Sequence, residues 1–210
     1  MSDSKFIAHA AASCLLFFMS VANADGPLIP DEKFVYCTVC HGVQLKGNRG
    51  LAAPRLSGMD AWYVKRQLEN FSKNWRGVHD ANPSGMEMRP MAAILTPQEI
   101  NEVSAFVNEV TSELPEATVK GDAARGESLY ASCSVCHGAE GEGNEGLGAP
   151  GLAGRNDWYL ARQIRLFRDG ARGSHPADTY GIQMRAAAGV LPDDDAINDV
   201  VAYLNTLQPE

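Results

Sequence analysis

Two short stretches decide how the rest of the sequence is interpreted: Cys37-Thr38-Val39-Cys40-His41 and Cys133-Ser134-Val135-Cys136-His137. Both follow the pattern C-x-x-C-H. This spacing is typical of c-type haem attachment, in which both thiols bond covalently to the porphyrin and the adjacent imidazole becomes an iron ligand. The sequence therefore predicts two covalently bound haem c groups, attached through Cys37, Cys40, Cys133 and Cys136, with His41 and His137 as iron ligands.

Two other uses of paired cysteines compete with haem attachment. A structural zinc site needs four ligands around one metal, which the two motifs could supply only by meeting in space. A thioredoxin-like redox pair needs a βαβ context, and the chain lacks the strand pattern for one. The fifth cysteine, Cys14, lies in an N-terminal apolar stretch. Two such motifs in one exported chain favour haem attachment over both alternatives.

Residues 1–24 have the pattern of a cleaved signal peptide. Lys5 precedes an apolar stretch over residues 10–22, and Ala22-Asn23-Ala24 offers the small residues that signal peptidase accepts. The stretch is short for a bilayer span, although a retained anchor, with peripheral membrane association, is the alternative. We therefore expect export to the periplasm and loss of Cys14 with the peptide.

The two motifs belong to an internal duplication. At a fixed offset of 96 residues and without gaps, residues 37–95 and 133–191 are identical at 27 of 59 positions. This repeat predicts two domains, residues 25–113 and 121–210, joined by a linker over residues 114–120. Matched pairs outside the motifs include Gln67/Gln163, Arg76/Arg172 and His79/His175.

Periodicity and capping residues predict an all-α fold with long Gly-rich loops. The 210 residues include 45% hydrophobic side chains, which is ordinary globular composition. The first haem helix is expected to be shorter than the second. The other expected helices cover residues 61–71, 122–135, 157–167 and 193–207, with one more starting at the N-cap Thr96.

The formal net charge of −8 argues against a nucleic acid partner. Residues 25–114 carry −2 and residues 115–210 carry −6. Within the second half, Asp193, Asp194 and Asp195 either steer a basic partner or simply cap a solvated helix start, and the second interpretation is preferred.

Each iron needs a sixth ligand or an open position. Met88 and Met184 occupy matched positions, each 47 residues after its haem-site histidine. A thioether suits haem iron and raises its potential, and a glycine three residues earlier favours a loop that turns tightly. We therefore predict Met88 and Met184 as sixth ligands, with core filling as the plainer role.

Four other side chains compete for the sixth position. Met86 and Met91 lie near Met88 but have no methionine at the matched positions. His79 and His175 are matched and would give bis-histidine irons at lower potential. A surface position, or contact with a haem propionate, is the preferred role for both histidines.

Further matched residues are expected around the two sites. A proline carbonyl group is placed to accept the N–H of the iron-bound imidazole, unless the proline only stiffens its loop. Aromatic pairs are expected to wall the haem or the interface between the halves, although core aromatics would look the same. Arginines are expected to pair with propionates or to lie on a solvated helix face. These residues are Pro54, Pro150, Trp62, Tyr63, Trp158, Tyr159, Arg66 and Arg162.

The double C-x-x-C-H, the P-x-L-x-G loop, the W-Y-x-x-R-Q helix and the Met-Arg pair resemble the diheme cytochrome c4 family over nearly all of residues 31–207. The resemblance implies two tandem class I cytochrome c domains about a pseudo-twofold axis, with His41 and Met88 at one iron and His137 and Met184 at the other. It also implies a periplasmic electron carrier. The implied donor is a quinol–cytochrome c reductase or a dehydrogenase, and the implied acceptor is a terminal oxidase, such as one of the cbb3 type.

The sequence therefore predicts electron transfer rather than catalysis. The alternative is an electron-accepting or catalytic haem subunit of a thiosulfate dehydrogenase or a peroxidase-type enzyme, which as a catalyst would need an open iron or a labile ligand. Matched methionines in both halves argue against an open iron. No residue in the sequence stands out as a distal acid or base.

Overall fold

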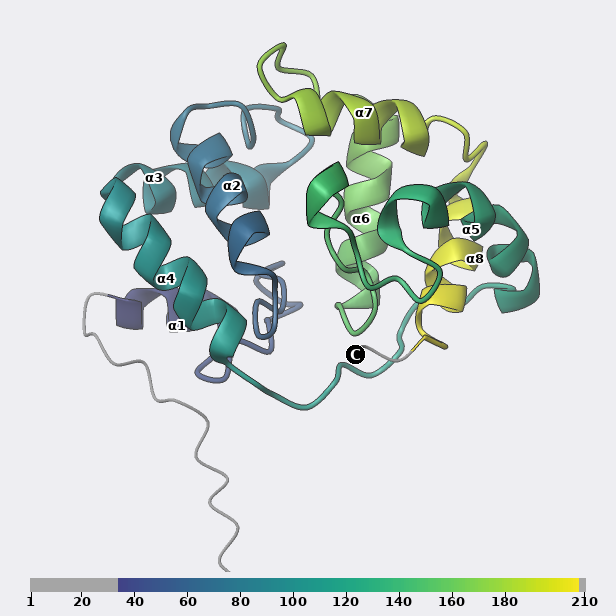
Figure 1. Cartoon of the computed structure of the whole chain (residues 1–210), viewed down its shortest axis with the longest axis horizontal. Helices are drawn as coiled ribbons and strands as arrows, with labels where there is room; N and C mark the ends of the chain where they lie inside the picture. The colour runs from purple at the N-terminus through teal and green to yellow at the C-terminus, as the bar shows by residue number, and fades with distance from the viewer. Residues whose placement is uncertain (1–33, 208–210) are drawn as a thin grey trace, which may run out of the picture.

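The computed structural model describes residues 34–207, so the predicted signal peptide, Cys14 and residues 25–33 and 208–210 lie outside the described residues. The described chain is all-helical, as predicted. Figure 1 shows two groups of helices, joined by an extended segment. The first group is α1 (Val35–His41), α2 (Ala61–Ser72), α3 (Pro83–Ala93) and α4 (Pro97–Glu109), and the second is α5 (Ala123–His137), α6 (Asp157–Arg168), α7 (Thr179–Ala188) and α8 (Asp194–Leu204).

Side-chain caps fix where several helices begin. The Thr96 hydroxyl group accepts the Glu99 N–H at the start of α4, and the Glu99 carboxylate accepts the Thr96 N–H in return. Asp122 caps the N-terminus of α5 and Asp193 that of α8, because their carboxylates accept backbone N–H groups of the first turn. These starts confirm the boundaries predicted from the capping pattern. Within the described residues, α1 spans 7 residues against 15 in α5.

The prediction of a loop around each methionine was wrong, because α3 and α7 occupy these segments. Asn82 and Asp178 cap the two helices by accepting the N–H groups of Gly85 and Gly181. A Cβ atom on Gly85 would lie 2.1 Å from Asn82 Nδ2, and one on Gly181 would lie 2.1 Å from Asp178 Oδ2. Each glycine therefore serves a tight helix cap, not a flexible turn.

Each domain has its own apolar core. In the first domain α2 packs against α3 and α4, and in the second α8 packs against both α5 and α6. The first core includes Leu45, Phe106 and Val107, and the second includes Ile197 and Val201. Two separate cores of similar composition are what a duplicated domain requires.

The segment between the domains is attached at both ends. Arg55 Nη1 donates to Ser112 Oγ at 2.5 Å, just after α4. The carboxylate of Asp157, which is 1% exposed, accepts the N–H groups of Thr118 and Val119. These contacts fix the course of the connecting segment. None of the helices within residues 34–207 is long and apolar enough to cross a bilayer.

Candidate haem-binding sites

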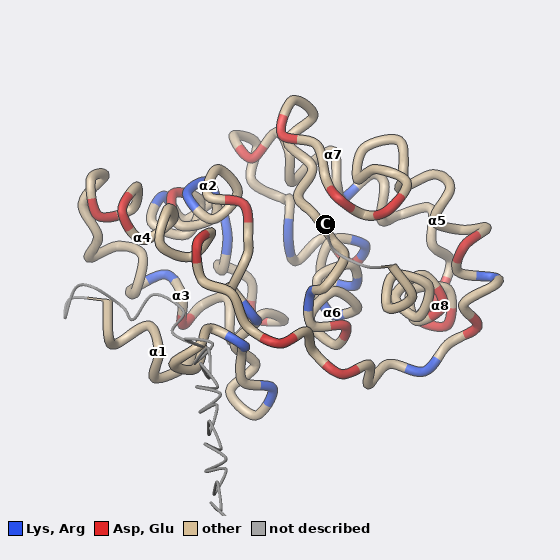
Figure 2. The backbone as a smooth tube through the Cα atoms, turned by 60° about the horizontal axis from the view of Figure 1, so that its bottom comes forward, with Lys and Arg blue, Asp and Glu red and all other residues tan. Residues whose placement is uncertain are grey.

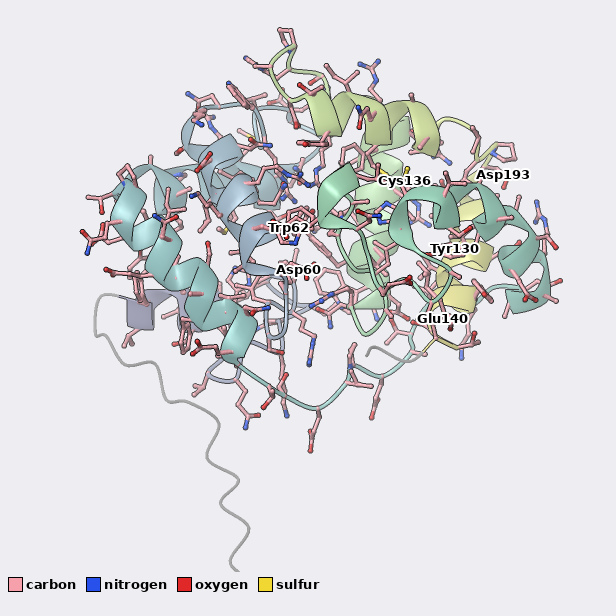
Figure 3. The ribbon with its side chains drawn as sticks, in the orientation of Figure 1. Asp60, Trp62, Tyr130, Cys136, Glu140 and Asp193 are labelled. Carbon is pink, nitrogen blue, oxygen red and sulfur yellow. The ribbon has the colours of Figure 1, made fainter. Side chains whose placement is uncertain are left out.

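Each domain contains an apolar cavity beside its C-x-x-C-H motif. The cysteines, the histidine and the methionine predicted for each site line a single cavity, although the methionine is distant in sequence. Figure 3 labels Cys136, on the α5 motif of the second domain. The first cavity is lined by Cys37, Cys40, His41 and Met88, and the second by Cys133, Cys136, His137 and Met184.

The two histidines are held in one orientation by proline carbonyl groups. His41 Nδ1 lies 2.7 Å from the carbonyl oxygen of Pro54, and His137 Nδ1 lies 2.8 Å from that of Pro150. Because a carbonyl oxygen only accepts, Nδ1 carries the proton and Nε2 keeps its lone pair for a metal. Burial lowers the pKa of both histidines and outweighs the opposite effect of the carbonyl contact. Both rings are therefore poised as neutral ligands, with the contact expected for Pro54 and Pro150.

The rivals for the sixth position differ in where they lie. Met88 and Met184 are half-buried at the cavity walls. Met91 also lines the first cavity but is 41% exposed, whereas Met86 is not among the residues lining it. At the matched position of Met91, the second cavity has Ala187. The geometry thus favours the matched pair and leaves Met91 as the rival to test.

The matched histidines lie away from the cavities. Neither His79 nor His175 is among the residues lining them. Each ring instead accepts, at Nδ1, the N–H group two residues later, at 3.1 Å. The His175 ring also stacks on Trp75, with ring centroids 5.5 Å apart. This placement agrees with the preferred surface role and not with bis-histidine ligation.

Only half of the predicted aromatic residues reach the cavities. Tyr63 and Tyr159 line both cavities, so they wall the sites and the interface together. Trp62 and Trp158 line neither, which corrects their expected place beside the haem. Each tryptophan packs edge-on against its neighbouring tyrosine, with centroids 5.8 and 5.9 Å apart. Figure 3 shows Trp62 on α2, beside the second domain.

The predicted arginines cross the interface between the domains. Arg66 Nη2 donates to the carbonyl oxygen of Gly148 at 2.6 Å, and Arg162 Nη2 donates to that of Ala52 at 3.1 Å. Gly148 and Ala52 are matched positions in the duplication. Arg66 therefore lines the second cavity and Arg162 the first. Neither side chain lies on a solvated helix face, which corrects that alternative.

Two further arginines, for which the sequence predicted no role, form the centre of the interface. Arg76 and Arg172 are 7% and 6% exposed. Arg76 Nη2 donates to the Tyr159 hydroxyl group at 2.8 Å, and Arg172 Nη2 donates to that of Tyr63 at 3.1 Å. Both guanidinium groups also donate to Gln67 and Gln163. The signal was present, because Arg76/Arg172 and Gln67/Gln163 are matched pairs.

The lining of the cavities fits a haem group. Buried guanidinium Nε atoms of Arg76 and Arg162 at the first cavity, and of Arg155 at the second, have no hydrogen-bond partner within residues 34–207. Such donors suit the propionate carboxylates of a porphyrin. Burial raises the pKa of the Cys37 and Cys133 thiols.

The zinc alternative fails on geometry. Among the described residues, no group of three or more His, Cys, Asp or Glu side chains lies close enough to hold a metal ion. The two C-x-x-C-H motifs therefore do not meet to form one site, and each serves its own cavity.

Comparisons with known proteins agree with this architecture. The cytochrome c family matches residues 33–111 and 123–208. A thiosulfate dehydrogenase electron acceptor of Stutzerimonas stutzeri (strain A1501) is 31% identical, over 92% of this chain and 91% of that protein. Cytochrome c4 of Azotobacter vinelandii is 28% identical, over 89% of this chain and 92% of that protein. The crystal structure of reduced recombinant cytochrome c4 from Pseudomonas stutzeri superposes with a TM-score of 0.67 at 26% identity, covering 84% of this chain and 95% of the other.

Proposed function

The chain belongs to the cytochrome c family, with two domains that bind two covalent haem c groups, and from this premise we propose a periplasmic one-electron carrier. In this proposal His41 and Met88 would hold one haem iron, and His137 and Met184 the other, so that both irons would be closed to substrates. The mature chain begins after Ala24. Its domains cover residues 25–113 and 121–210, joined by the linker over residues 114–120.

One observation carries this proposal: each cavity brings together a histidine and a methionine from matched positions. Haem iron, when bound, supplies reversible one-electron chemistry whose potential depends on its axial ligands. The carbonyl groups of Pro54 and Pro150 hold the imidazole rings in place. The thioethers of Met88 and Met184, which line the cavities, would bind the irons and so would exclude water and substrates from them. Two such sites suit electron exchange and leave no position for a reacting molecule.

The two sites share a wall, which supports transfer between them inside one molecule. Five residues line both cavities: Met59, Tyr63, Gln67, Tyr159 and Gln163. The side chains of all of these but Met59 are tied together by hydrogen bonds from Arg76 and Arg172. A rigid shared wall keeps the distance between the sites constant and limits reorganisation. We infer that an electron entering one domain passes to the other without dissociation of a partner.

The proposed donor is a periplasmic dehydrogenase or a quinol–cytochrome c reductase, and the proposed acceptor is a terminal oxidase of the respiratory chain. The similarity to a protein named as a thiosulfate dehydrogenase electron acceptor supports a dehydrogenase donor. In the alternative function, the chain is the dedicated electron-accepting subunit of such an enzyme, and catalysis resides in its partner.

A reductive titration of the purified holoprotein tests the carrier function. We expect two one-electron steps per chain, with no turnover when peroxide or thiosulfate is supplied alone. A thiosulfate dehydrogenase together with thiosulfate should reduce both haems. Turnover of either substrate by the chain alone would contradict the carrier function. Reduction by a quinol–cytochrome c reductase but not by the dehydrogenase would select the reductase as the donor.

A further inference from the structure

The two loops that follow the haem-site histidines have the same backbone conformation. Gly47 N–H donates to the carbonyl oxygen of His41 at 2.9 Å, and Gly143 N–H donates to that of His137 at 2.8 Å. Each loop is then closed by an isolated antiparallel bridge, Asn48 with Ala53 in one domain and Asn144 with Ala149 in the other. Matched positions on the two loops are therefore structurally equivalent.

Each loop lies beside apolar side chains that nothing in the described structure covers. The valines inside the two motifs, Val39 and Val135, are 72% and 74% exposed, and Val43 is 75% exposed. Leu51 lines the first cavity and Leu147 the second, and about half of each side chain is exposed. Exposed apolar residues at the opening of a functional cavity are typical of a docking surface.

The charges around these apolar residues are reversed between the domains. The first loop carries Lys46 and Arg49, where the second carries Glu142 and Glu145. The second loop also carries Glu140, where the first has neutral Gln44. Figure 2 colours the acidic and basic positions along the backbone, and Figure 3 labels Glu140. The two apolar surfaces therefore have rims of opposite sign.

Internal contacts neutralise only part of these charges. Lys46 Nζ lies 2.9 Å from Glu113 Oε2, but the two side chains are 41% and 88% exposed, and ion pairs with an exposed partner exchange readily. Glu87 on α3 also lines the first cavity. Within residues 34–207, the glutamates of the second loop form no ion pair, and Glu142 accepts only the Glu140 N–H, at 3.0 Å. The acidic rim is thus fully available, and Arg49 is the freest charge on the basic rim.

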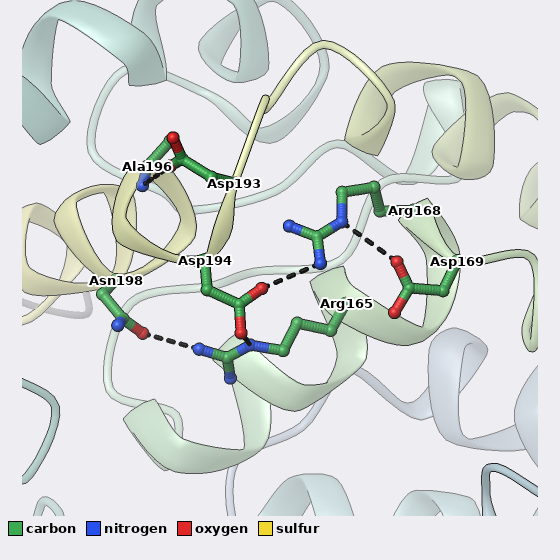
Figure 4. Close-up of polar contacts among 7 residues, drawn as sticks. All are labelled: Arg165, Arg168, Asp169, Asp193, Asp194, Ala196 and Asn198. Carbon is green, nitrogen blue, oxygen red and sulfur yellow. Dashed lines mark hydrogen bonds and ion pairs between the residues drawn. The ribbon is translucent and has the colours of Figure 1, made fainter.

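In the other acidic run of the second domain, residues 193–195, two of the three carboxylates have internal contacts. Figure 4 shows Asp194 between Arg165 and Arg168, with both contacts at 2.8 Å. Asp193 accepts the Ala196 N–H as the cap of α8. The contact of Asp193 agrees with the preferred capping role, whereas Asp195 is exposed. The exposed glutamates of the second haem loop, by contrast, lie next to residues that line the second cavity.

We propose that the two domains dock redox partners of opposite charge. The second-domain face, Val135 and Leu147 with Glu140, Glu142 and Glu145, takes a partner with a basic rim. The first-domain face, Val39, Val43 and Leu51 with Lys46 and Arg49, takes a partner with an acidic rim. This proposal rests on the carrier function and adds that donor and acceptor bind at separate domains, so both can be bound at once.

Stopped-flow electron transfer with two probes of known charge tests the docking faces. The probes are a basic mitochondrial-type cytochrome c and an acidic plastocyanin, each mixed with the two-haem protein at low salt. The triple variant Glu140→Gln/Glu142→Gln/Glu145→Gln should slow transfer with the basic probe about tenfold and leave the acidic probe within about twofold. Lys46→Gln/Arg49→Gln should do the reverse. High salt should remove both differences.

A matched control variant separates the effect of the loop charges on the electron-transfer rate from the effect of the net charge. Glu109→Gln/Glu116→Gln/Glu127→Gln removes three exposed carboxylates away from the loop and should leave both rates within about twofold. Three results would overturn the two-face proposal while the protein still carries electrons. The control variant could slow electron transfer as much as the loop variants do, or one loop variant could slow transfer equally with both probes. The third such result is that neither loop variant changes either rate. Wild-type protein that exchanges electrons with neither probe would instead overturn the carrier function and the docking faces with it.

Discussion

Arg76 in the first domain donates a hydrogen bond to the hydroxyl group of Tyr159 in the second, across 2.8 Å. The duplication returns the contact, because Arg172 of the second domain donates to Tyr63 of the first. Burial alone would raise the pKa of Tyr63, but the guanidinium groups of Arg172 and Arg76 lower it further than burial raises it. Each domain thus inserts a buried cation into a site that only the other domain completes.

Removal of the Tyr159 hydroxyl group should weaken the interface. Tyr159→Phe leaves a buried guanidinium N–H with one acceptor fewer, and we expect a loss of about 1–3 kcal/mol in the free energy of unfolding. Urea unfolding followed by circular dichroism measures it. Tyr180→Phe is the matched control, because Tyr180 is 43% exposed and packs by its ring under Arg66. Equal stability of the two variants would contradict an interface held by Arg76.

Substitution of single methionines should distinguish the iron ligands from a methionine that only lines the cavity. Met88→Ala and Met184→Ala should each remove about half of the weak charge-transfer absorption at the red end of the ferric spectrum that reports iron–thioether bonding. Met91→Ala should leave that absorption unchanged, although Met91 lines the same cavity as Met88. Loss of the band in Met91→Ala and its retention in Met88→Ala would reassign the first iron to Met91.

The carboxylate of Asp157 should make the free energy of unfolding depend on pH in the acidic range. Burial alone would raise its pKa, but hydrogen bonds from Val119, Thr118 and Trp158 outweigh burial and lower it. A lowered folded-state pKa means that the stabilisation is complete above the unfolded-state pKa of about 4 and is lost as pH falls through the folded value.

The variant Asp157→Asn should therefore be less stable than wild type by about 1–3 kcal/mol at neutral pH, and the difference should shrink below about pH 4. Urea midpoints measured across this range give the difference. Asp195→Asn, at an exposed position on α8, should show no such convergence. If the free energies of unfolding of wild type and Asp157→Asn differ by the same amount at every pH, the ionised carboxylate is ruled out as the cause of the pH dependence.

Gly181 should tolerate no side chain. An added Cβ atom would meet Asp178 Oδ2 at 2.1 Å, so Gly181→Ala must displace the cap of the helix that carries Met184. We expect a loss of about 1–3 kcal/mol in stability together with a weaker iron–thioether band. Gly189→Ala is the control, since its φ is −65° and the nearest atom lies 3.3 Å away. Wild-type behaviour of Gly181→Ala would show that the cap can move freely.

Much of the architecture is predictable because its signals are local. The capping box at Thr96 and Glu99 and the cap at Asp122 specify helix starts through neighbouring residues alone. The prediction failed at α3 and α7, where little apolar periodicity marks a helix and a glycine at the third position suggests a turn. In α3 Pro90 also stands inside the helix. The tight caps by Asn82 and Asp178 become visible only in three dimensions.

Contacts between the domains were the least predictable part of the sites. Arg66 and Arg162 each reach the cavity of the other domain. This depends on how the two domains pack against each other, which no local sequence pattern predicts. Arg155 lines the second cavity with an unpartnered Nε, yet Met59 stands at its matched position, so duplication gave no signal for it. The matched pair Arg76 and Arg172 could have been assigned a shared role from the repeat alone.

Exposure of the fully reduced protein to carbon monoxide tests the central claim most directly, because this gas binds ferrous haem only where the sixth position is open or its ligand is labile. With Met88 and Met184 in place, the ferrous absorption spectrum should not change on addition of the gas at neutral pH. A shift of the spectrum that accounts for both haems would contradict closed irons, and with them the assignment of this chain as an electron carrier.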